Sequence, residues 1–129
     1  MDRVVIVGGD FAGLAAARRL GSEAFEVVVV DQHNFHTFQP LLYQVATAGL
    51  DPADVACPIR TVLRRSHNVW FVRGRASGFD LSARSVFLED GWRPSYDHLI
   101  VASGATAATF GVPGVADHAL LLYTLDDAR

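Results

Sequence analysis

The feature that most constrains this chain is a strand-like run, a glycine-containing turn, a helix and a second strand-like run, all within about thirty residues. Residues 4–7 are a continuous β-branched run, which is typical of a strand buried on both faces of a parallel sheet. Residues 14–20 are rich in the helix formers Ala, Arg and Leu, and residues 25–30 form the second run. This order predicts a βαβ unit and therefore an α/β fold.

The composition is that of one packed domain. The chain has 129 residues, of which half are hydrophobic and 19% are charged, so it is not a disordered segment. A net charge of -3 argues against binding to nucleic acid. Cys57 is the only cysteine, which excludes an intramolecular disulfide and a cysteine-only metal site. The sequence shows no secretory signal and no apolar run of membrane-spanning length, so we expect a cytoplasmic chain without a transmembrane segment.

The turn between the first strand and the first helix has most of a dinucleotide-binding motif. The motif G-x-G-x-x-G needs glycine for the tight turn, for approach of the backbone to a pyrophosphate, and for close packing of the helix on the strand. Here Gly8 and Gly13 match, but the middle position holds Asp10. Asp31 ends the second strand-like run, where an acid accepts hydrogen bonds from ribose hydroxyls in such sites.

Asp10 bears directly on whether the turn binds its ligand. A carboxylate about 4 Å from a phosphate charge costs roughly 4 kcal/mol at an effective dielectric of about 20, and less if the side chain turns to solvent. The alternative interpretation is that Asp10 only caps the helix and that the site is weak or inactive. The residues alone leave both interpretations open.

The middle of the chain is expected to be less regular. Residues 31–50 are predicted to be an irregular, aromatic-rich connection that packs against something or has a function. A helix is predicted from Pro52, capped by Asp51, to about Arg65, with Cys57 in the core.

Short strands and turns dominate the rest of the sequence. Residues 68–72 and 98–102 are predicted to be further parallel strands, and residues 76–96 a three-stranded antiparallel meander. Residues 105–122 are expected to be a loop, and residues 124–129 the capped start of a helix.

Three stretches together resemble the type II NADH dehydrogenases, which are single-polypeptide NADH:quinone oxidoreductases. They are V-V-I-V-G-G with F-A-G-L at residues 4–14, F-Q-P-L-L-Y-Q-V-A-T-A-G-L at residues 38–50, and Y-D-H-L-I-V-A-S-G at residues 96–104. The middle stretch is the most specific, because general dinucleotide-binding proteins have no such segment.

The resemblance implies a Rossmann-like FAD-binding domain with a parallel sheet and an inserted three-stranded meander. It implies that the pyrophosphate turn holds FAD, that Asp31 holds the ribose, that Ala76 contacts adenine, and that Ser103 and Gly104 pass the cofactor. Gln44 and Thr47 would lie near the flavin. The candidate cofactor-binding residues are thus Gly8, Gly9, Asp10, Phe11, Ala12, Gly13, Asp31, Gln44, Thr47, Ala76, Ser103 and Gly104.

The resemblance also implies an activity and partners for a complete enzyme. NADH would give a hydride to FAD, and the electrons would pass to a quinone at the cytoplasmic face of the membrane. Residues 1–129 would be the N-terminal part of the FAD-binding domain, without the NADH domain and the C-terminal region. We expect no catalytic side chain and no metal site, since His33 and His36 have no further ligand cluster. Partners would be the missing C-terminal part or a second copy of the chain.

Two other interpretations remain. The chain could be a non-catalytic remnant or interaction module in which Asp10 weakens dinucleotide binding. It could also be a plain NAD-binding Rossmann domain, although the aromatic segment and the meander argue against this.

Overall fold

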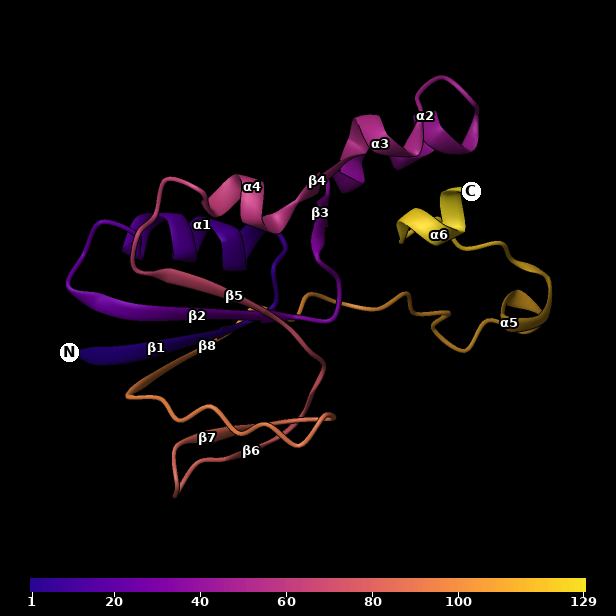
Figure 1. Ribbon diagram of the computed structural model, residues 1–129. Helices are drawn as coiled ribbons and strands as arrows, with labels where there is room; N and C mark the ends of the chain where they lie inside the picture. Colours follow the sequence, from indigo (N-terminus) through magenta and orange to yellow (C-terminus); the bar gives the residue numbers. More distant parts are fainter. The chain divides into compact units, whose positions relative to one another are not determined.

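A computed structural model describes residues 1–129, which divide into two compact units. The first unit comprises Met1–His36 and Pro58–Gly104, and the second comprises Thr37–Cys57 and Ala105–Arg129. The first unit contains the four-stranded sheet (Figure 1). It also contains both hydrophobic core clusters.

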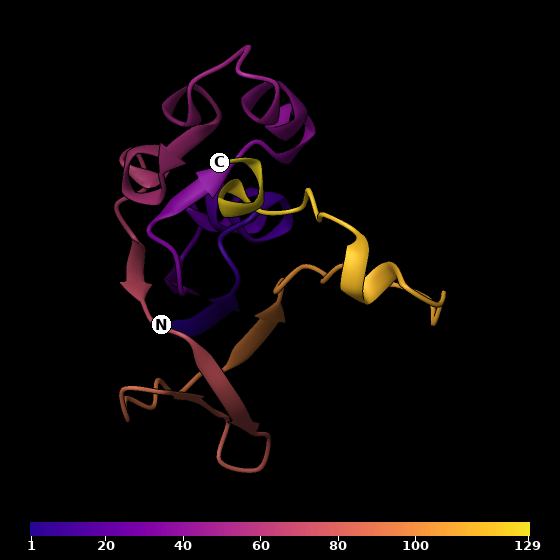
Figure 2. The ribbon, with the colours of Figure 1, turned by 90° about the vertical axis from the view of Figure 1, so that its right-hand side faces the viewer.

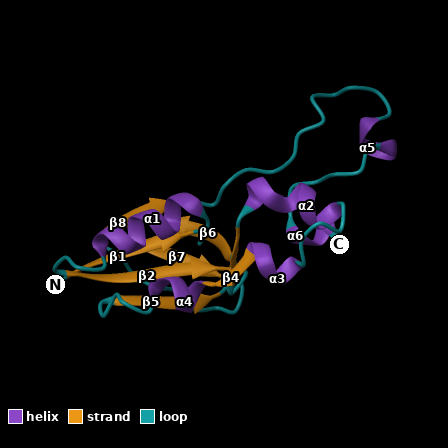
Figure 3. Cartoon of the chain, turned by 90° about the horizontal axis from the view of Figure 1, so that it is seen from above, coloured by secondary structure: helices purple, strands orange, loops and turns teal.

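A four-stranded parallel sheet is the centre of the first unit (Figure 3). Its strands are β1 (Asp2–Val7), β2 (Phe25–Asp31), β5 (Val69–Arg73) and β8 (His98–Val101), in the order β5-β2-β1-β8. β1 pairs with β2 from Asp2↔Phe25 to Val7↔Val30 and, on its other side, with β8. The predicted βαβ unit and the two further parallel strands are confirmed.

Side chains of β1 alternate between two buried layers. On one face of the sheet, Val4 and Ile6 pack with α1 (Phe11–Leu20) and α4 (Ile59–Leu63). On the other face, Val5 and Val7 pack with residues of the antiparallel hairpin described next. Each fully buried Val or Ile side chain contributes about 1.5–3 kcal/mol relative to an exposed one, so the continuous β-branched run stabilises both layers at once.

The hairpin consists of β6 (Ala76–Asp80) and β7 (Ser85–Leu88), which pair in antiparallel fashion (Figure 2). A third pass of chain follows, and its carbonyls at Trp92 and Pro94 accept hydrogen bonds from the N–H groups of Leu88 and Val86, at 3.0 Å each. This third pass pairs with β7 through one isolated antiparallel β-bridge, Ser85↔Ser95. Proline has no N–H to donate, so the third strand of the predicted meander is reduced to an irregular pass.

The predicted helix from Pro52 to about Arg65 is wrong. The segment forms two short helices, α3 (Pro52–Val55) and α4 (Ile59–Leu63), separated by the strand β4 (Ala56–Pro58). Pro58 cannot donate an intrahelical hydrogen bond and favours an extended conformation at the residue before it. Cys57 therefore lies in a strand and is partly exposed, not in the core of a helix.

Residues 31–50 are also more regular than predicted. They contain β3 (Phe35–Thr37), which forms a two-stranded sheet with β4, and then a 3-10 turn (Gln39–Leu41) and α2 (Leu42–Ala46). The predicted loop between residues 105 and 122 contains one short helix, α5 (Val115–His118).

The predicted helix start at residues 124–129 is confirmed as α6 (Leu125–Ala128). Thr124 Oγ1 accepts a hydrogen bond from the N–H of Asp127 at 3.2 Å, and Asp127 Oδ2 accepts from the N–H groups of Thr124 and Tyr123 at 2.7 and 3.0 Å. These donors, chiefly the backbone N–H of Thr124, hold the pKa of Asp127 below its ordinary value because they stabilise the charged carboxylate.

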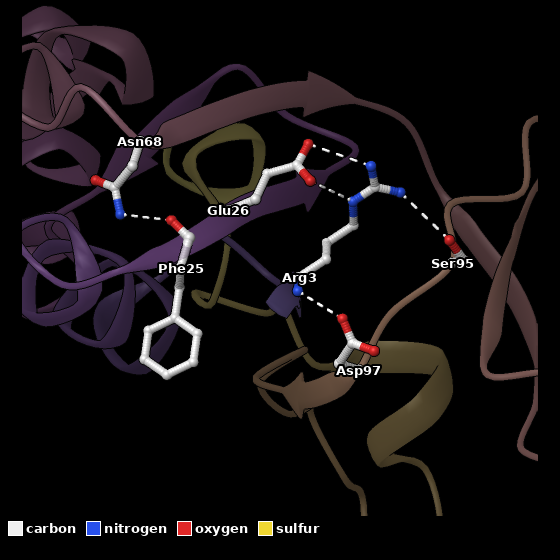
Figure 4. A network of polar contacts seen from close by, with 6 residues as sticks. All are labelled: Arg3, Phe25, Glu26, Asn68, Ser95 and Asp97. Carbon is white, nitrogen blue, oxygen red and sulfur yellow. Dashed lines mark hydrogen bonds and ion pairs between the residues drawn. The ribbon is translucent and has the colours of Figure 1, made fainter. Parts of the chain in front are cut away.

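A polar network ties the strands together at the amino end of the sheet (Figure 4). Arg3 Nε donates to Glu26 Oε2 on the neighbouring strand at 2.9 Å, and the Arg3 backbone N–H donates to Asp97 Oδ2 at 2.7 Å. Arg3 Nη1 also donates to Ser95 Oγ at 3.3 Å. The contacts join β1 to β2 and to the residues that lead into β8.

The side chain of Asn68 closes the loop between α1 and β2. Its Nδ2 donates to the backbone carbonyls of Leu20, Glu23 and Phe25 at 2.9, 3.1 and 2.9 Å. An Asn68→Ala variant should therefore lower the free energy of unfolding by about 1–3 kcal/mol, since partly buried carbonyls lose their donor. Urea denaturation followed by circular dichroism measures the loss. Asn34→Ala removes an exposed amide and should change stability by less than about 0.5 kcal/mol, and equal losses would contradict the role of Asn68.

Candidate dinucleotide-binding site

A cavity of the first unit lies where the parallel strands end. It has a volume of about 280 Å³ and is bordered by the last residues of β1, β2 and β8 and the first of β6. Ligands of open parallel sheets bind at this carboxyl edge, because loops and helix N-termini converge there. The lining residues are Val7, Gly8, Asp10, Val30, Asp31, Gln32, Gly74, Arg75, Ala76, Phe79, Val101, Ala102 and Ser103.

Two glycines of the turn beside this cavity leave no space for a side chain. Gly8 has a φ of 110°, and a Cβ added to it would stand 2.0 Å from the carbonyl oxygen of Ala102. A Cβ on Gly13 would stand 1.8 Å from the carbonyl oxygen of Gly8. The turn therefore packs backbone against backbone, as the glycine motif predicts.

Asp10 occupies the N-cap position of α1 but does not act as a capping side chain. Its φ and ψ are −87° and −162°, and its carboxylate makes no capping hydrogen bond. The first turn of α1 also carries no acidic side chain. The positive end of the helix dipole is thus not neutralised within the first turn, which suits an anionic ligand. The interpretation that the Asp10 side chain caps the helix is therefore wrong, although the residue occupies the N-cap position.

The carboxylate of Asp10 lies at the border of the cavity. Its side chain is 64% exposed, and Oδ1 lies 3.5 Å from Nδ1 of His36. Asp10 stands where the motif has its second glycine. It therefore adds a charged side chain at a position that glycine would leave open.

Asp31 connects the end of β2 to the glycine turn. Its Oδ2 accepts a hydrogen bond from the N–H of Gly9 at 2.6 Å, and its Oδ1 accepts from the N–H of His33 at 2.7 Å. A carboxylate can accept about four hydrogen bonds, so capacity remains for the hydroxyls of a ribose. Asp31 thus fixes the glycine turn through the Gly9 N–H, in addition to its proposed role of binding ribose.

The structure brings most of the predicted site residues together. Gly8, Asp10, Asp31, Ala76 and Ser103 line the cavity. Gly9, Phe11, Ala12 and Gly13 belong to the same turn and helix start, and Gly104 follows Ser103 with a φ of 75°.

Gln44 and Thr47 are not among the lining residues. Both belong to the second unit: Gln44 is a half-buried residue of α2, and Thr47 is an exposed residue directly after it. Thr47 Oγ1 donates to the backbone carbonyl of Tyr43 at 2.9 Å, and Gln44 Nε2 donates to the Tyr43 hydroxyl at 3.0 Å. Their proposed place near a flavin stays a prediction.

The polar and aromatic side chains of the cavity that sequence reasoning missed are Gln32, Arg75 and Phe79. Arg75 is the one cationic residue among the lining residues, and its Nε lies 3.7 Å from Glu89 Oε1. Their position in the sequence could have indicated Gln32 and Arg75. Both follow the ends of parallel strands, β2 and β5, and these ends meet at the carboxyl edge of the sheet.

No group of three or more His, Cys, Asp or Glu residues is placed to hold a metal ion. No helix combines the length and the apolar character that crossing a membrane requires.

A parallel sheet with a glycine turn after its first strand, an acid at the end of its second and an antiparallel hairpin on one face defines a dinucleotide-binding α/β fold. The family model of the pyridine nucleotide-disulphide oxidoreductases matches residues 2–129, and the chain belongs to this family. Two relatives from Mycobacterium tuberculosis, the type II NADH:quinone oxidoreductases Ndh and NdhA, are 39% and 40% identical to it over 129 residues.

Solved structures confirm the fold. NDH2 from Plasmodium falciparum in complex with NADH has a TM-score of 0.86 at 22% identity, and it matches over 98% of this chain. The sulfide:quinone oxidoreductase of Aquifex aeolicus has the same TM-score at 23% identity, over 99% of this chain.

The chain spans only part of these proteins. It covers 28% and 27% of the two mycobacterial relatives, and 27% and 30% of the two solved structures.

Proposed function

We propose that residues 1–129 are the N-terminal part of an FAD-binding domain, and that the complete protein oxidises NADH and reduces a quinone. The proposal is supported by the family membership and by the two mycobacterial relatives, which are named as NADH:quinone oxidoreductases and match 98% of this chain. The NADH-binding domain and a C-terminal region would lie outside these residues.

The observation that carries the cofactor assignment is the cradle formed by the glycine turn. At Gly8 and Gly13 even a Cβ would collide with backbone atoms, so the backbone packs closely here and stays open to a ligand on the cavity side. The dipole of α1, a helix of ten residues, points its positive end at this turn. An extended diphosphate fits this combination, because its charge can meet backbone N–H groups of the turn and of the helix start.

Different residues at the cavity would bind different parts of the cofactor. The turn from Gly8 to Gly13 would hold the pyrophosphate, Asp31 would accept hydrogen bonds from the ribose hydroxyls, and the backbone at Ala76 would contact adenine. Ser103 and Gly104 would flank the cofactor, and Gln44 and Thr47 would lie near the isoalloxazine ring.

A bound flavin would supply the redox chemistry, by accepting a hydride from NADH and passing two electrons to a quinone. No acid, base or nucleophile of this chain is required for that transfer. The role of the chain is to bind the cofactor and orient it. For the complete protein we propose a peripheral position on the cytoplasmic face of the membrane, where quinones are accessible. The missing C-terminal part, or a second copy of the chain, would then be its partner.

One observation favours a second candidate function. The exposed carboxylate of Asp10 stands at the pyrophosphate turn, and a negative charge there opposes binding of a diphosphate. A chain whose affinity is lost in this way would be a non-catalytic remnant or an interaction module.

Titration of the purified chain with FAD tests both functions. Binding should quench flavin fluorescence and shift the visible absorption bands, and a large excess of NAD⁺ should not displace the flavin. Binding of NAD⁺ in place of FAD would instead indicate a plain NAD-binding Rossmann domain. A folded chain that binds neither dinucleotide, while its Asp10→Gly variant binds FAD, would support the remnant.

A further inference from the structure

His36 presents an unpartnered polar atom next to the glycine turn. The side chain lies on β3 and is 15% exposed, and its Nδ1 is buried without a hydrogen-bond partner. A buried polar atom without a hydrogen-bond partner destabilises the folded state, so such an atom often marks a functional contact. Nδ1 lies 3.5 Å from Oδ1 of Asp10, a separation at which the two groups interact electrostatically without a hydrogen bond.

The imidazole is held in place, whereas the carboxylate is free to rotate. The ring of His36 packs against the ring of Phe11 in an edge-to-face arrangement, with centroids 4.8 Å apart. Asp10 is largely exposed and makes no capping bond, so a side-chain rotation can bring its oxygen within hydrogen-bond distance of Nδ1. Its second oxygen, Oδ2, lies 4.0 Å from the position that a Cβ on Gly104 would take.

The other charged groups nearby already have partners. The carboxylate of Asp31 accepts hydrogen bonds from the N–H groups of Gly9 and His33, and Arg75 faces Glu89. Asp31 is itself an anion, and Arg75, the one cation of the cavity lining, already faces a carboxylate, whereas Nδ1 of His36 has no hydrogen-bond partner.

We propose that His36 is a positioning residue that binds the carboxylate of Asp10 and keeps it away from the pyrophosphate position at the start of α1. The inference rests on the proposed FAD site, because it explains how the turn accepts a diphosphate although its middle glycine is replaced by an acid. A donor at Nδ1 draws the carboxylate sideways and offsets part of its charge. The N–H groups of the first helical turn then meet the ligand with less repulsion from this carboxylate.

The first test measures FAD affinity in two backgrounds. His36→Leu keeps apolar packing against Phe11 but removes the donor, and it should weaken binding about tenfold when residue 10 is Asp. In an Asp10→Gly background the same change should have almost no effect, since no carboxylate remains to be positioned. His36→Asn, whose amide nitrogen lies near the position of Nδ1, should restore most of the affinity.

A purely structural role of His36 predicts a different result. It would weaken binding equally in both backgrounds, and that outcome overturns the proposal, as does the absence of any loss when residue 10 is Asp. Thermal melts of every variant show whether the fold is retained.

The second test needs no cofactor and separates failure of the pairing from failure of the proposed function. Long-range ¹H–¹⁵N spectra of the ligand-free chain, recorded where the imidazole is neutral, report which ring nitrogen carries the proton. We expect the proton on Nδ1 in the natural chain and a shift toward Nε2–H in Asp10→Gly. An unprotonated Nδ1 in the natural chain would overturn the pairing. If no variant binds FAD but Nδ1 is protonated, the pairing stands and the FAD site is wrong.

Discussion

A Gly13→Ala variant is expected to lose about 3 kcal/mol or more of its free energy of unfolding, which is enough to unfold a domain of marginal stability. The added Cβ would stand 1.8 Å from the carbonyl oxygen of Gly8 and 2.9 Å from its carbonyl carbon. Both atoms belong to the backbone of a turn that is itself fixed by the hydrogen bond from Gly8 N–H to Val30 O at 2.8 Å. Relief would require α1 to move away from the sheet. Guanidinium denaturation followed by circular dichroism measures the loss.

Gly91→Ala is the control for an added methyl group without a steric clash. Unlike Gly13, which lies in α1, Gly91 has a positive φ of 91°, and no atom lies within 4 Å of the Cβ that alanine would add. Only the left-handed conformation is then unfavourable, at about 1–2 kcal/mol. Similar losses in the two variants would show that the close approach at Gly13 is not what stabilises the turn.

An Asp10→Gly variant should bind FAD at least about tenfold more tightly than the natural chain, because a carboxylate beside a diphosphate is removed. The difference should shrink as salt is added, since this carboxylate is 64% exposed and its repulsion is screened. Flavin fluorescence at two salt concentrations measures both effects. Asp10→Asn retains the size of the side chain and removes its charge, so it divides the gain into an electrostatic and a steric part.

Asp117→Asn controls for net charge. It removes one exposed carboxylate from α5, in the second unit, and should leave FAD affinity unchanged. If Asp10→Gly and Asp117→Asn gave equal gains, the effect would come from the overall charge of the chain and not from the turn.

The parallel sheet could be predicted from sequence because its signal is local. Residues 4–7 and 27–30 are continuous runs of Val and Ile, and every one of these residues is buried in the structure. A strand buried on both faces needs such a run, and few other structures of this length use one. The glycine turn could be predicted for a similar reason, since Gly8 and Gly13 fill positions where a side chain cannot.

The helix predicted from Pro52 is interrupted because Pro58 outweighs the helical spacing of the apolar residues. Val55, Ile59 and Leu63 are all buried and four residues apart, as one helix would require. Pro58 nevertheless divides the segment, and a short strand carries the chain between two helices. In the meander, Pro94 has the same consequence for the third strand.

The parts of the site that escaped prediction depend on long-range geometry. Arg75 and Phe79 reach the cavity because β5 and β6 deliver them to the carboxyl edge of the sheet. His36 lies beside Asp10 although it is 26 residues further along the chain, and no motif spacing connects the two. Such neighbours follow from topology and not from composition.

The position of β1 has a consequence for how the chain folds. On one side β1 pairs with β2, which follows it after a single helix, but on the other side Val4 pairs with His98. Closing that second ladder brings together segments that are far apart in sequence, and the entropy of the intervening loop must be lost before the contacts form. During synthesis on the ribosome, β1 and the glycine turn would therefore emerge long before β8, which pairs with β1. Until β8 arrives, one edge of β1 is a hydrophobic strand edge open to other chains.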